Sequence, residues 1–175
     1  IGSDEEHFWL HKPPGLPVFP PHQNPTGACL LHWWQENGAP ALSWPEGFEG
    51  GIAHRLDTLT SGLVVAAKNI ASLEKLRGEF QRGELRKIYR FHSDGVVDFD
   101  RRLCEWSIGH HPRKEDRMVV QMQAKTPVRG KWYPAWSRFA RIEGPLWEVE
   151  IHSGVMHQIR VHAAALGIPL RGDSI

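Results

Sequence analysis

The residues most capable of chemistry lie in one stretch, residues 51–68, with the sequence GIAHRLDTLTSGLVVAAK. His54, Arg55 and Asp57 come directly before an apolar run at 63–67. A buried strand needs neither an arginine nor a carboxylate at its start, so these residue types suggest a role beyond folding. An aspartate in a turn is most often a cap or an Asx-turn residue, and that ordinary alternative stays open for Asp57.

Other catalytic chemistries match the sequence less well. Eleven histidines make a metal site conceivable, but none falls at i,i+4 in a predicted helix with an acidic third ligand. A metal-dependent hydrolase is therefore a minor alternative. Ser61 lacks the G-x-S-x-G context of a nucleophile, and we predict that it forms a turn with Thr60. No phosphate loop, GxGxxG, HExxH or paired CxxC is present in the sequence, so we expect no metal and no cofactor.

Length and composition limit the class of protein. A chain of 175 residues suits a single domain, predicted here as residues 1–175, with a core of real size. No apolar run is long enough to cross a bilayer, so we expect no membrane partner. The two cysteines, Cys29 and Cys104, favour a reducing compartment, which predicts the cytoplasm. The start at Ile1 without a signal peptide and the abrupt stop at Ile175 suggest that both termini are incomplete.

The net charge of +1 hides an asymmetry along the chain. Residues 1–57 carry two basic and seven acidic side chains, and the remainder carries nineteen basic and thirteen acidic ones. Residues 77–90 hold five basic and two acidic groups, and residues 124–141 hold five basic groups, four aromatics and no acidic group. Cations that alternate with aromatic rings suit phosphates and bases, so a nucleic acid is one candidate partner. A solvated surface with core aromatics is the other interpretation of these segments.

The elements that must position these residues are mixed. Alternation and apolar runs predict strands, and spacings of three and four predict helices. Without regular βαβ alternation, the order favours an α+β fold with a mostly antiparallel sheet. We expect strands at 62–67, 87–92, 118–122, 136–143 and 146–152, helices at 27–37, 69–82 and 157–166, a loop at 37–51, and a polar, loop-rich segment at 93–135.

Four motifs in order resemble a known family. HRLDTLTSGLVVAAK at 54–68 is similar to HRLDxxTSGLxxxAK, the signature of the RluA-type pseudouridine synthases. The family's K-P-x-G-L-x-V segment resembles residues 12–18, and its K-x-Y motif resembles 87–89. Its late H-Q-I-R-V-H motif, followed by G-x-P and G-D, resembles 157–162, 167–169 and 172–173. The resemblance covers residues 8–173, nearly the whole chain.

This resemblance implies a pseudouridine-synthase-like fold and an isomerase. Such an enzyme flips a uridine out of rRNA or tRNA, breaks its glycosidic bond and rejoins the uracil through C5 without a cofactor. It makes Asp57 the catalytic aspartate, as nucleophile at C1′ or as an aid to elimination at C2′, and Arg160 the cation that keeps it ionised. It makes Tyr89 a catalytic residue against the uracil ring. The substrate-binding residues that it implies are Arg55 in the vacated stack, Ile159 against the base, His54 and Lys87.

Alternatives for single residues stay open, and so does one for the whole chain. Arg55 could form a structural ion pair, Tyr89 could be a core aromatic, and Arg160 could be an exposed helix arginine. Where the family usually has G-R-T-H-Q, this chain has Val155 and Met156 in place of the Arg and Thr. That departure gives some support to a non-catalytic RNA-binding protein that keeps the fold. We expect the segment 110–136 to help to select the RNA.

Overall fold

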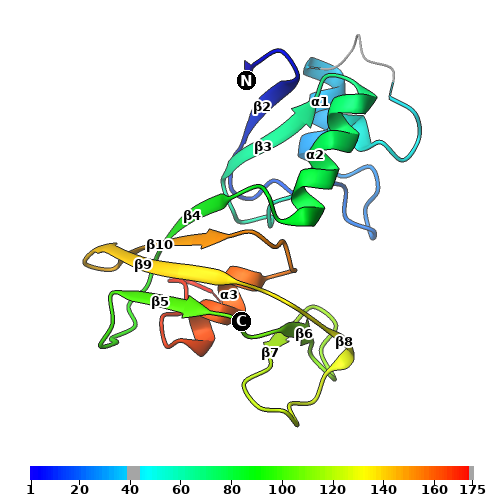
Figure 1. Ribbon diagram of the computed structural model, residues 1–175. Helices are drawn as coiled ribbons and strands as arrows, with labels where there is room; N and C mark the ends of the chain where they lie inside the picture. Colours follow the sequence, from blue (N-terminus) through cyan, green and yellow to red (C-terminus); the bar gives the residue numbers. More distant parts are fainter. Residues whose placement is uncertain (39–43, 174–175) are drawn as a thin grey trace. The chain divides into compact units, whose positions relative to one another are not determined.

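A computed structural model describes residues 1–38 and 44–173, and in it the chain forms two compact units that divide between Glu79 and Phe80 (Figure 1). The prediction of one domain over 1–175 stays a prediction. The elements of the first unit are β1 Gly2–Ser3, β2 His7–Lys12, α1 Leu30–Asn37, a 3-10 turn Glu49–Gly51, β3 Gly62–Ala67 and α2 Ile70–Arg82, which runs across the division. Those of the second are β4 Lys87–His92, β5 Arg101–Cys104, β6 Ile108–His110, β7 Met118–Val120, β8 Arg129–Tyr133, β9 Ser137–Glu143, β10 Leu146–Ile151 and α3 Gln158–Ala165.

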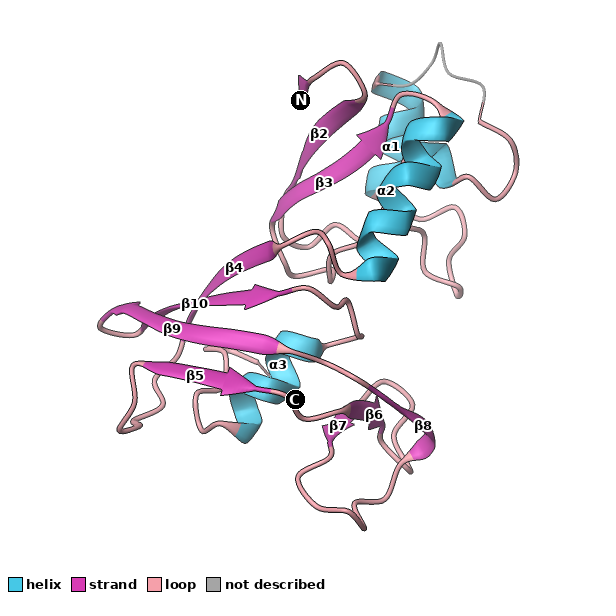
Figure 2. Ribbon diagram, viewed as in Figure 1, coloured by secondary structure: helices cyan, strands magenta, loops and turns pink. Residues whose placement is uncertain are grey.

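The first unit is a three-stranded antiparallel sheet, ordered β1-β2-β3, with two helices (Figure 2). The helix α2 begins after Asn69, whose Oδ1 accepts the backbone N–H of Ser72 at 2.9 Å, and this satisfies one of the donors that a helix start leaves open. It ends before Gly83, whose φ of +68° is a conformation that glycine adopts without a steric penalty. Asn69 and Gly83 therefore fix the limits of α2.

The second unit consists of two antiparallel sheets with α3 packed against both. One sheet has the order β4-β10-β9-β5 and the other has the order β7-β6-β8. Ala163 belongs to the core under the larger sheet. Val161 belongs to a second cluster with Ile108 and Met118 of the smaller sheet. Two residues apart on a helix point to nearly opposite sides, so α3 is held on two faces.

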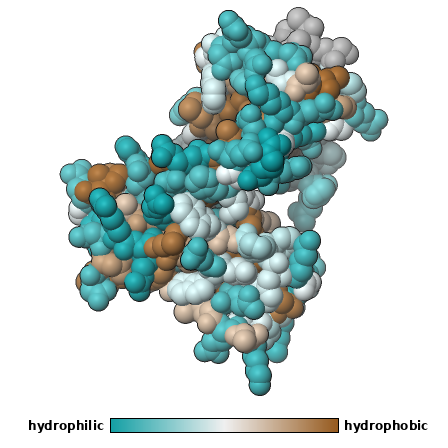
Figure 3. All heavy atoms as spheres, viewed as in Figure 1, coloured by the Kyte–Doolittle hydropathy of each residue, from teal (hydrophilic) through white to brown (hydrophobic). Residues whose placement is uncertain are grey.

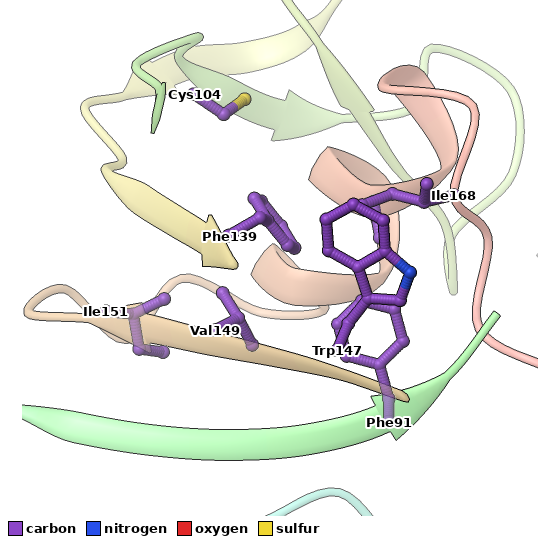
Figure 4. Packing of buried hydrophobic residues seen from close by; sticks show 8 residues of the cluster. Phe91, Cys104, Phe139, Trp147, Val149, Ile151 and Ile168 are labelled. Atoms are coloured by element: carbon purple, nitrogen blue, oxygen red, sulfur yellow. The ribbon is translucent and has the colours of Figure 1, made fainter. Parts of the chain in front are cut away.

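The main core of the second unit lies between the larger sheet and α3. Trp147, Val149 and Ile151 alternate along β10 and are buried, and Phe139 of β9 meets them (Figure 4). Ile168, which follows α3, closes the cluster from the helix side. This alternation is what a sheet with one packed face requires, and it fixes which residues of β4 face the core.

Most of the elements were predictable, but several strands were not. The predicted α+β class and antiparallel pairing are confirmed, and the strand predicted at 62–67 coincides with β3. The prediction of a loop-rich segment at 93–135 was incomplete, because β5, β6 and β8 lie there in addition to β7. β2 was also missed. Residues 39–43 of the predicted loop at 37–51 lie outside the described residues.

The surface in the view of Figure 3 is mostly hydrophilic, with separate hydrophobic patches. In the parts of the chain that are described, no helix has the length and apolarity needed to cross a membrane.

From its position in the core, we expect truncation of Phe139 to lower the stability of the fold strongly. Phe139 is fully buried on β9, whereas Ile142 on the same strand is 46% exposed. Phe139→Ala should lower the free energy of unfolding by about 3–5 kcal/mol, because it removes buried ring contacts and leaves a cavity. The matched Ile142→Ala change should cost about 1 kcal/mol or less. Urea unfolding of both variants measures the difference, and equal costs would contradict the assigned core.

Candidate active site

The backbone around His54 is fixed along one edge of β3. Ala53 N–H donates to the Val65 carbonyl at 3.0 Å, and Val65 N–H donates to His54 Nε2 at 3.1 Å. Ile52 and Ala66 form a β-bridge just before this point. The histidine ring therefore serves as an acceptor for a strand amide, and the chain that leads to Asp57 is tied to the sheet.

Arg55, Leu56 and Asp57 differ in burial. Leu56 is 7% exposed, Arg55 is exposed and Asp57 is half-buried. Thr60 N–H donates to the Asp57 carbonyl at 3.0 Å, which closes a turn. The buried leucine thus holds the segment while the two charged neighbours reach the surface.

Lys12 is a residue that the sequence reasoning did not single out as functional. Its side chain is fully buried, and Nζ donates to the carbonyls of Leu16 at 2.7 Å, Pro13 at 3.0 Å and Thr58 at 3.0 Å. The Thr58 carbonyl also accepts Gly15 N–H at 2.8 Å. One ammonium therefore joins the segment after β2 to the residue that follows Asp57.

The position of Lys12 gives it two electrostatic effects. Burial lowers the pKa of its ammonium, and the nearby Asp57 carboxylate acts in the opposite direction. Lys12 follows Leu10 by two residues on β2, and both are buried. A lysine at an inward position of an alternating strand is the signal in the sequence that could have identified it.

In the second unit, Tyr89 and Ile159 border the same core. Both are partly buried and pack against the cluster that contains Phe139 and Trp147. Tyr89 lies on β4 directly opposite Val149 of β10. Tyr89 and Phe91 lie on the same face of β4, since both contact this core. The structure therefore brings the predicted residues Tyr89 and Ile159 to the border of one core.

Lys87 lies two residues before Tyr89 on the same strand. Its Nζ stands 5.4 Å from the centroid of the Phe80 ring, and burial lowers the pKa of its ammonium. A cation that is partly desolvated over an aromatic face is attracted to it by the ring quadrupole. Lys87 is thus held in place by a ring.

Arg160 is fixed by Asp173. Its Nε donates to Oδ2 of Asp173 at 2.8 Å, and Nη2 donates to Oδ1 at 2.5 Å. The Asp173 side chain is 9% exposed and that of Arg160 is 25% exposed. This bidentate geometry orients the guanidinium. Arg160 is therefore not an exposed helix arginine, which was the alternative left open by the sequence. Asp173 had been noted only as part of a motif, and the pairing of Arg160 with Asp57 stays a prediction.

A buried chain of hydrogen bonds holds the first turn of α3. Gln158 Nε2 donates to the Trp136 carbonyl at 2.8 Å and to Ser137 Oγ at 3.1 Å. Ser137 Oγ lies 2.9 Å from His162 Nδ1, and His162 Nε2 lies 2.9 Å from the Trp106 carbonyl. Since a carbonyl only accepts, His162 donates from Nε2 and accepts the Ser137 hydroxyl at Nδ1. Each donor among these four hydrogen bonds then has an acceptor.

The same glutamine shapes the loop before α3. Gln158 Oε1 accepts the Ser153 hydroxyl at 2.8 Å and Val155 N–H at 3.2 Å. Val155 packs against the core of the smaller sheet, and Met156 is 42% exposed. His157 has a left-handed backbone with φ of +55°, which is uncommon for a side chain with a Cβ. The two departures from the family motif therefore lie in a loop that Gln158 organises.

The predicted residues thus fall into two sets. The first unit holds His54, Arg55 and Asp57 on one fixed segment, and the second holds Lys87, Tyr89, Ile159 and Arg160 on β4 and α3. Across residues 1–38 and 44–173, no group of three His, Cys, Asp or Glu side chains is placed to bind a metal ion.

Comparisons with known proteins agree on one family. The RNA pseudouridylate synthase profile matches residues 6–165. An uncharacterized RNA pseudouridine synthase of Aquifex aeolicus is 33% identical over 99% of this chain and 54% of its own length. The ribosomal large subunit pseudouridine synthase D of Escherichia coli is 33% identical over 100% of this chain and 51% of its own length. The chain spans about half the length of the curated relatives that it matches.

Solved structures share the fold. Human RNA pseudouridylate synthase domain containing 1 superposes with a TM-score of 0.77 at 19% identity, over 99% of this chain and 66% of that one. Human RNA pseudouridylate synthase domain containing 4 gives 0.74 at 21% identity, over 98% and 66%.

The buried ring of His162 predicts a loss of stability in acid. Burial lowers its pKa below the ordinary value of 6.5. The unfolded chain therefore binds the proton more readily, and the free energy of unfolding falls as pH drops below 6.5, by at most about 1.4 kcal/mol per pH unit for this one proton. His162→Gln should be less stable at pH 7 and show a shallower decline towards pH 5 by urea unfolding. His11→Gln, at an exposed position, should keep the wild-type slope, and an unchanged slope in His162→Gln would contradict the prediction.

Proposed function

The chain belongs to the RNA pseudouridylate synthase family, and from that membership we propose that it is an isomerase that converts a uridine of an RNA into pseudouridine. The match over residues 6–165 is the observation that carries this proposal. The reaction moves the uracil from an N1–C1′ bond to a C5–C1′ bond. It adds no atom and removes none, so it requires no redox cofactor.

Asp57 is the proposed catalytic carboxylate. Breaking a glycosidic bond leaves electron deficiency on the sugar, which a carboxylate offsets by attack or by charge. Direct attack at C1′ and assistance to elimination at C2′ both need a carboxylate that is ionised and held in place. The ties of His54 to β3 and of Lys12 to the Thr58 carbonyl support this role, because they restrict the backbone on both sides of Asp57.

The other predicted residues receive roles on the same uridine. A base in folded RNA must leave its stack before it can react, and the exposed Arg55 suits the vacated space because its guanidinium stacks and donates at once. Tyr89 and Ile159 would contact the extruded uracil, and Tyr89 would move a proton during isomerisation. Arg160 would favour the ionised form of Asp57. We assign His54 and Lys87 to binding of the substrate, and we propose that residues 1–175 act as one catalytic domain.

Ribosomal RNA is the proposed substrate to test first, with tRNA second. Several relatives at 33–34% identity are named ribosomal large subunit pseudouridine synthase D, which favours rRNA. Cytoplasmic localisation follows as a proposal, and both cysteines are free thiols in the structure.

The loop at Val155 and Met156 gives a specific reason to keep a second candidate. If the residues usual in the family contribute to turnover there, a chain with Val155 and Met156 could bind RNA without modifying it. A turnover assay on bulk RNA separates the two functions, since only the isomerase forms pseudouridine.

Replacement of Asp57 is the direct test of the proposed reaction. Asp57→Asn keeps the shape and removes the charge, so pseudouridine formation should fall by about a thousandfold or more, with unchanged thermal unfolding. Bonding of C5 to the sugar displaces the C5 hydrogen, so release of tritium from rRNA labelled at uridine C5 measures turnover. Asp98→Asn, at an exposed position, is the control. Near wild-type release by Asp57→Asn would remove Asp57 from the mechanism.

Arg160 has a matched control in Arg171. Arg171 forms the same two-pronged pair with Asp94, at 2.9 and 2.5 Å, but both partners are exposed. Arg160→Ala should lower turnover by about a hundredfold and leave RNA affinity within threefold, because the proposed role is electrostatic at the reacting uridine. Arg171→Ala should alter neither. Tritium release and filter binding measure the two effects, and a normal rate for Arg160→Ala would exclude it from catalysis.

A further inference from the structure

A cavity of about 630 Å³ opens at the end of the larger sheet, where β10 ends and β9 begins. This size is within the range of small-molecule sites in proteins. None of the residues assigned to the proposed site lines it. Its walls come from four places in the second unit. These are the end of α2 (Phe80 to Gly83), the segment between β5 and β6 (Glu105 and Ser107), the segment before β9 (Pro134 to Trp136) and the residues after β10 (His152 and Ser153).

The two cation-rich segments of the sequence meet at this cavity. Phe80 to Gly83 belong to residues 77–90, and Pro134 to Trp136 belong to residues 124–141. These segments lie far apart in the chain, and only the fold brings them to one place. Among the lining residues Glu105 is the one acidic side chain. A surface cavity that combines aromatic rings with nearby cations has the composition of a nucleic-acid contact.

Trp136 is the central ring of the cavity. It is half-buried, so part of the indole faces the open space that it lines. The His152 ring meets it edge-to-face with centroids 5.1 Å apart, and the Arg138 guanidinium stands 5.2 Å from its centroid. These contacts hold the indole in place. Arg138 is 62% exposed, and its Nη1 also lies 3.9 Å from Glu150 Oε2, so its guanidinium stands beside the ring where a phosphate can reach it.

His152 adds a second oriented group. Its Nδ1 lies 2.9 Å from the Gly83 carbonyl and its Nε2 lies 3.0 Å from Glu150 Oε1. Both partners are acceptors, and the ring donates to at least one of them. The contact with the Gly83 carbonyl joins the end of α2 to the end of β10, which ties two walls of the cavity together.

Two hydrogen bonds connect lining residues of the cavity to α3. Ser153 donates to Gln158 Oε1 at 2.8 Å, and Gln158 Nε2 donates to the Trp136 carbonyl at 2.8 Å. Gln158 directly precedes Ile159 and Arg160, the two residues of α3 that we assign to the target uridine. A ligand in the cavity would therefore lie against the loop that positions these residues.

We propose that this cavity binds one base of the RNA strand next to the target uridine, stacked on Trp136, with Arg138 at its phosphate. The proposal rests on the proposed function for the identity of the RNA. Stacking on an aromatic ring is tolerant of sequence, so the subsite contributes affinity for any base rather than selection of one.

The test compares two single-stranded nonamers of equal charge: nonauridylate, and the same ribose-phosphate chain without bases. Trp136→Ala should weaken binding of nonauridylate about tenfold and binding of the abasic chain less than twofold, by fluorescence anisotropy at fixed salt. Trp136→Phe keeps a ring and should stay within threefold of wild type on both. Trp33→Ala, which removes another exposed indole, 42% exposed on α1, should match wild type.

The outcomes separate this proposal from the proposed function, because binding needs no turnover. An equal loss on both nonamers, or none on either, with thermal unfolding unchanged, overturns the stacking site even if wild type releases tritium from rRNA. A base-dependent loss supports it even if wild type releases none, in which case the isomerase proposal fails alone. Failure of wild type to prefer nonauridylate over the abasic chain also overturns it. If Trp136→Ala unfolds, Trp136→Leu provides the same comparison.

Discussion

The second unit depends on the buried hydrogen-bond chain that runs from the Trp106 carbonyl through His162 and Ser137 to Gln158. Apolar packing on both faces of α3 holds the helix against the sheets. The hydrogen-bond chain adds a directional constraint, because a shift of α3 along its axis would leave buried donors without acceptors, and each such loss costs about 1–3 kcal/mol. This hydrogen-bond chain therefore also fixes the positions of Ile159 and Arg160 on α3.

In the first unit, Lys12 and His54 fix the position of the backbone near Asp57. The Lys12 ammonium donates to three backbone carbonyls, and His54 Nε2 accepts a backbone N–H. A backbone carbonyl has little freedom to move away, so a loop tied in this way is stiffer than one tied by two flexible side chains. Burial of an ammonium is costly, and the three carbonyls on Lys12 offset that cost. The result is a carboxylate on a loop with little freedom to move.

Elements with a local periodicity in the sequence were predicted. Elements that depend on contacts with residues far away in the sequence were missed. The run Gly62–Ala67 and the alternation of Leu146–Ile151 carry their own periodicity. β5, with three exposed residues of four, has no such pattern, and it is a strand because β9 offers it a free edge. The predicted residues of the site came from spacing and motif. The inward position of Lys12 on an alternating strand is visible in the sequence. Its contact with the distant Thr58 carbonyl and the pairing of Asp173 with Arg160 could not be derived, because they join residues outside one element.

Charge is distributed unevenly along the chain. Asp57 closes a segment with five more acidic than basic groups, whereas the remainder has six more basic than acidic groups. Phosphates are attracted to the second part and repelled by the first, and that attraction is weakened by salt because it depends on the release of counterions. The chemistry proposed for Asp57 would depend on one ionised carboxylate and not on the number of phosphates held elsewhere. Affinity for RNA should therefore fall steeply with salt while the rate at saturating RNA changes little, and the opposite pattern would mean that the basic segments 77–90 and 124–141 act on the reaction itself.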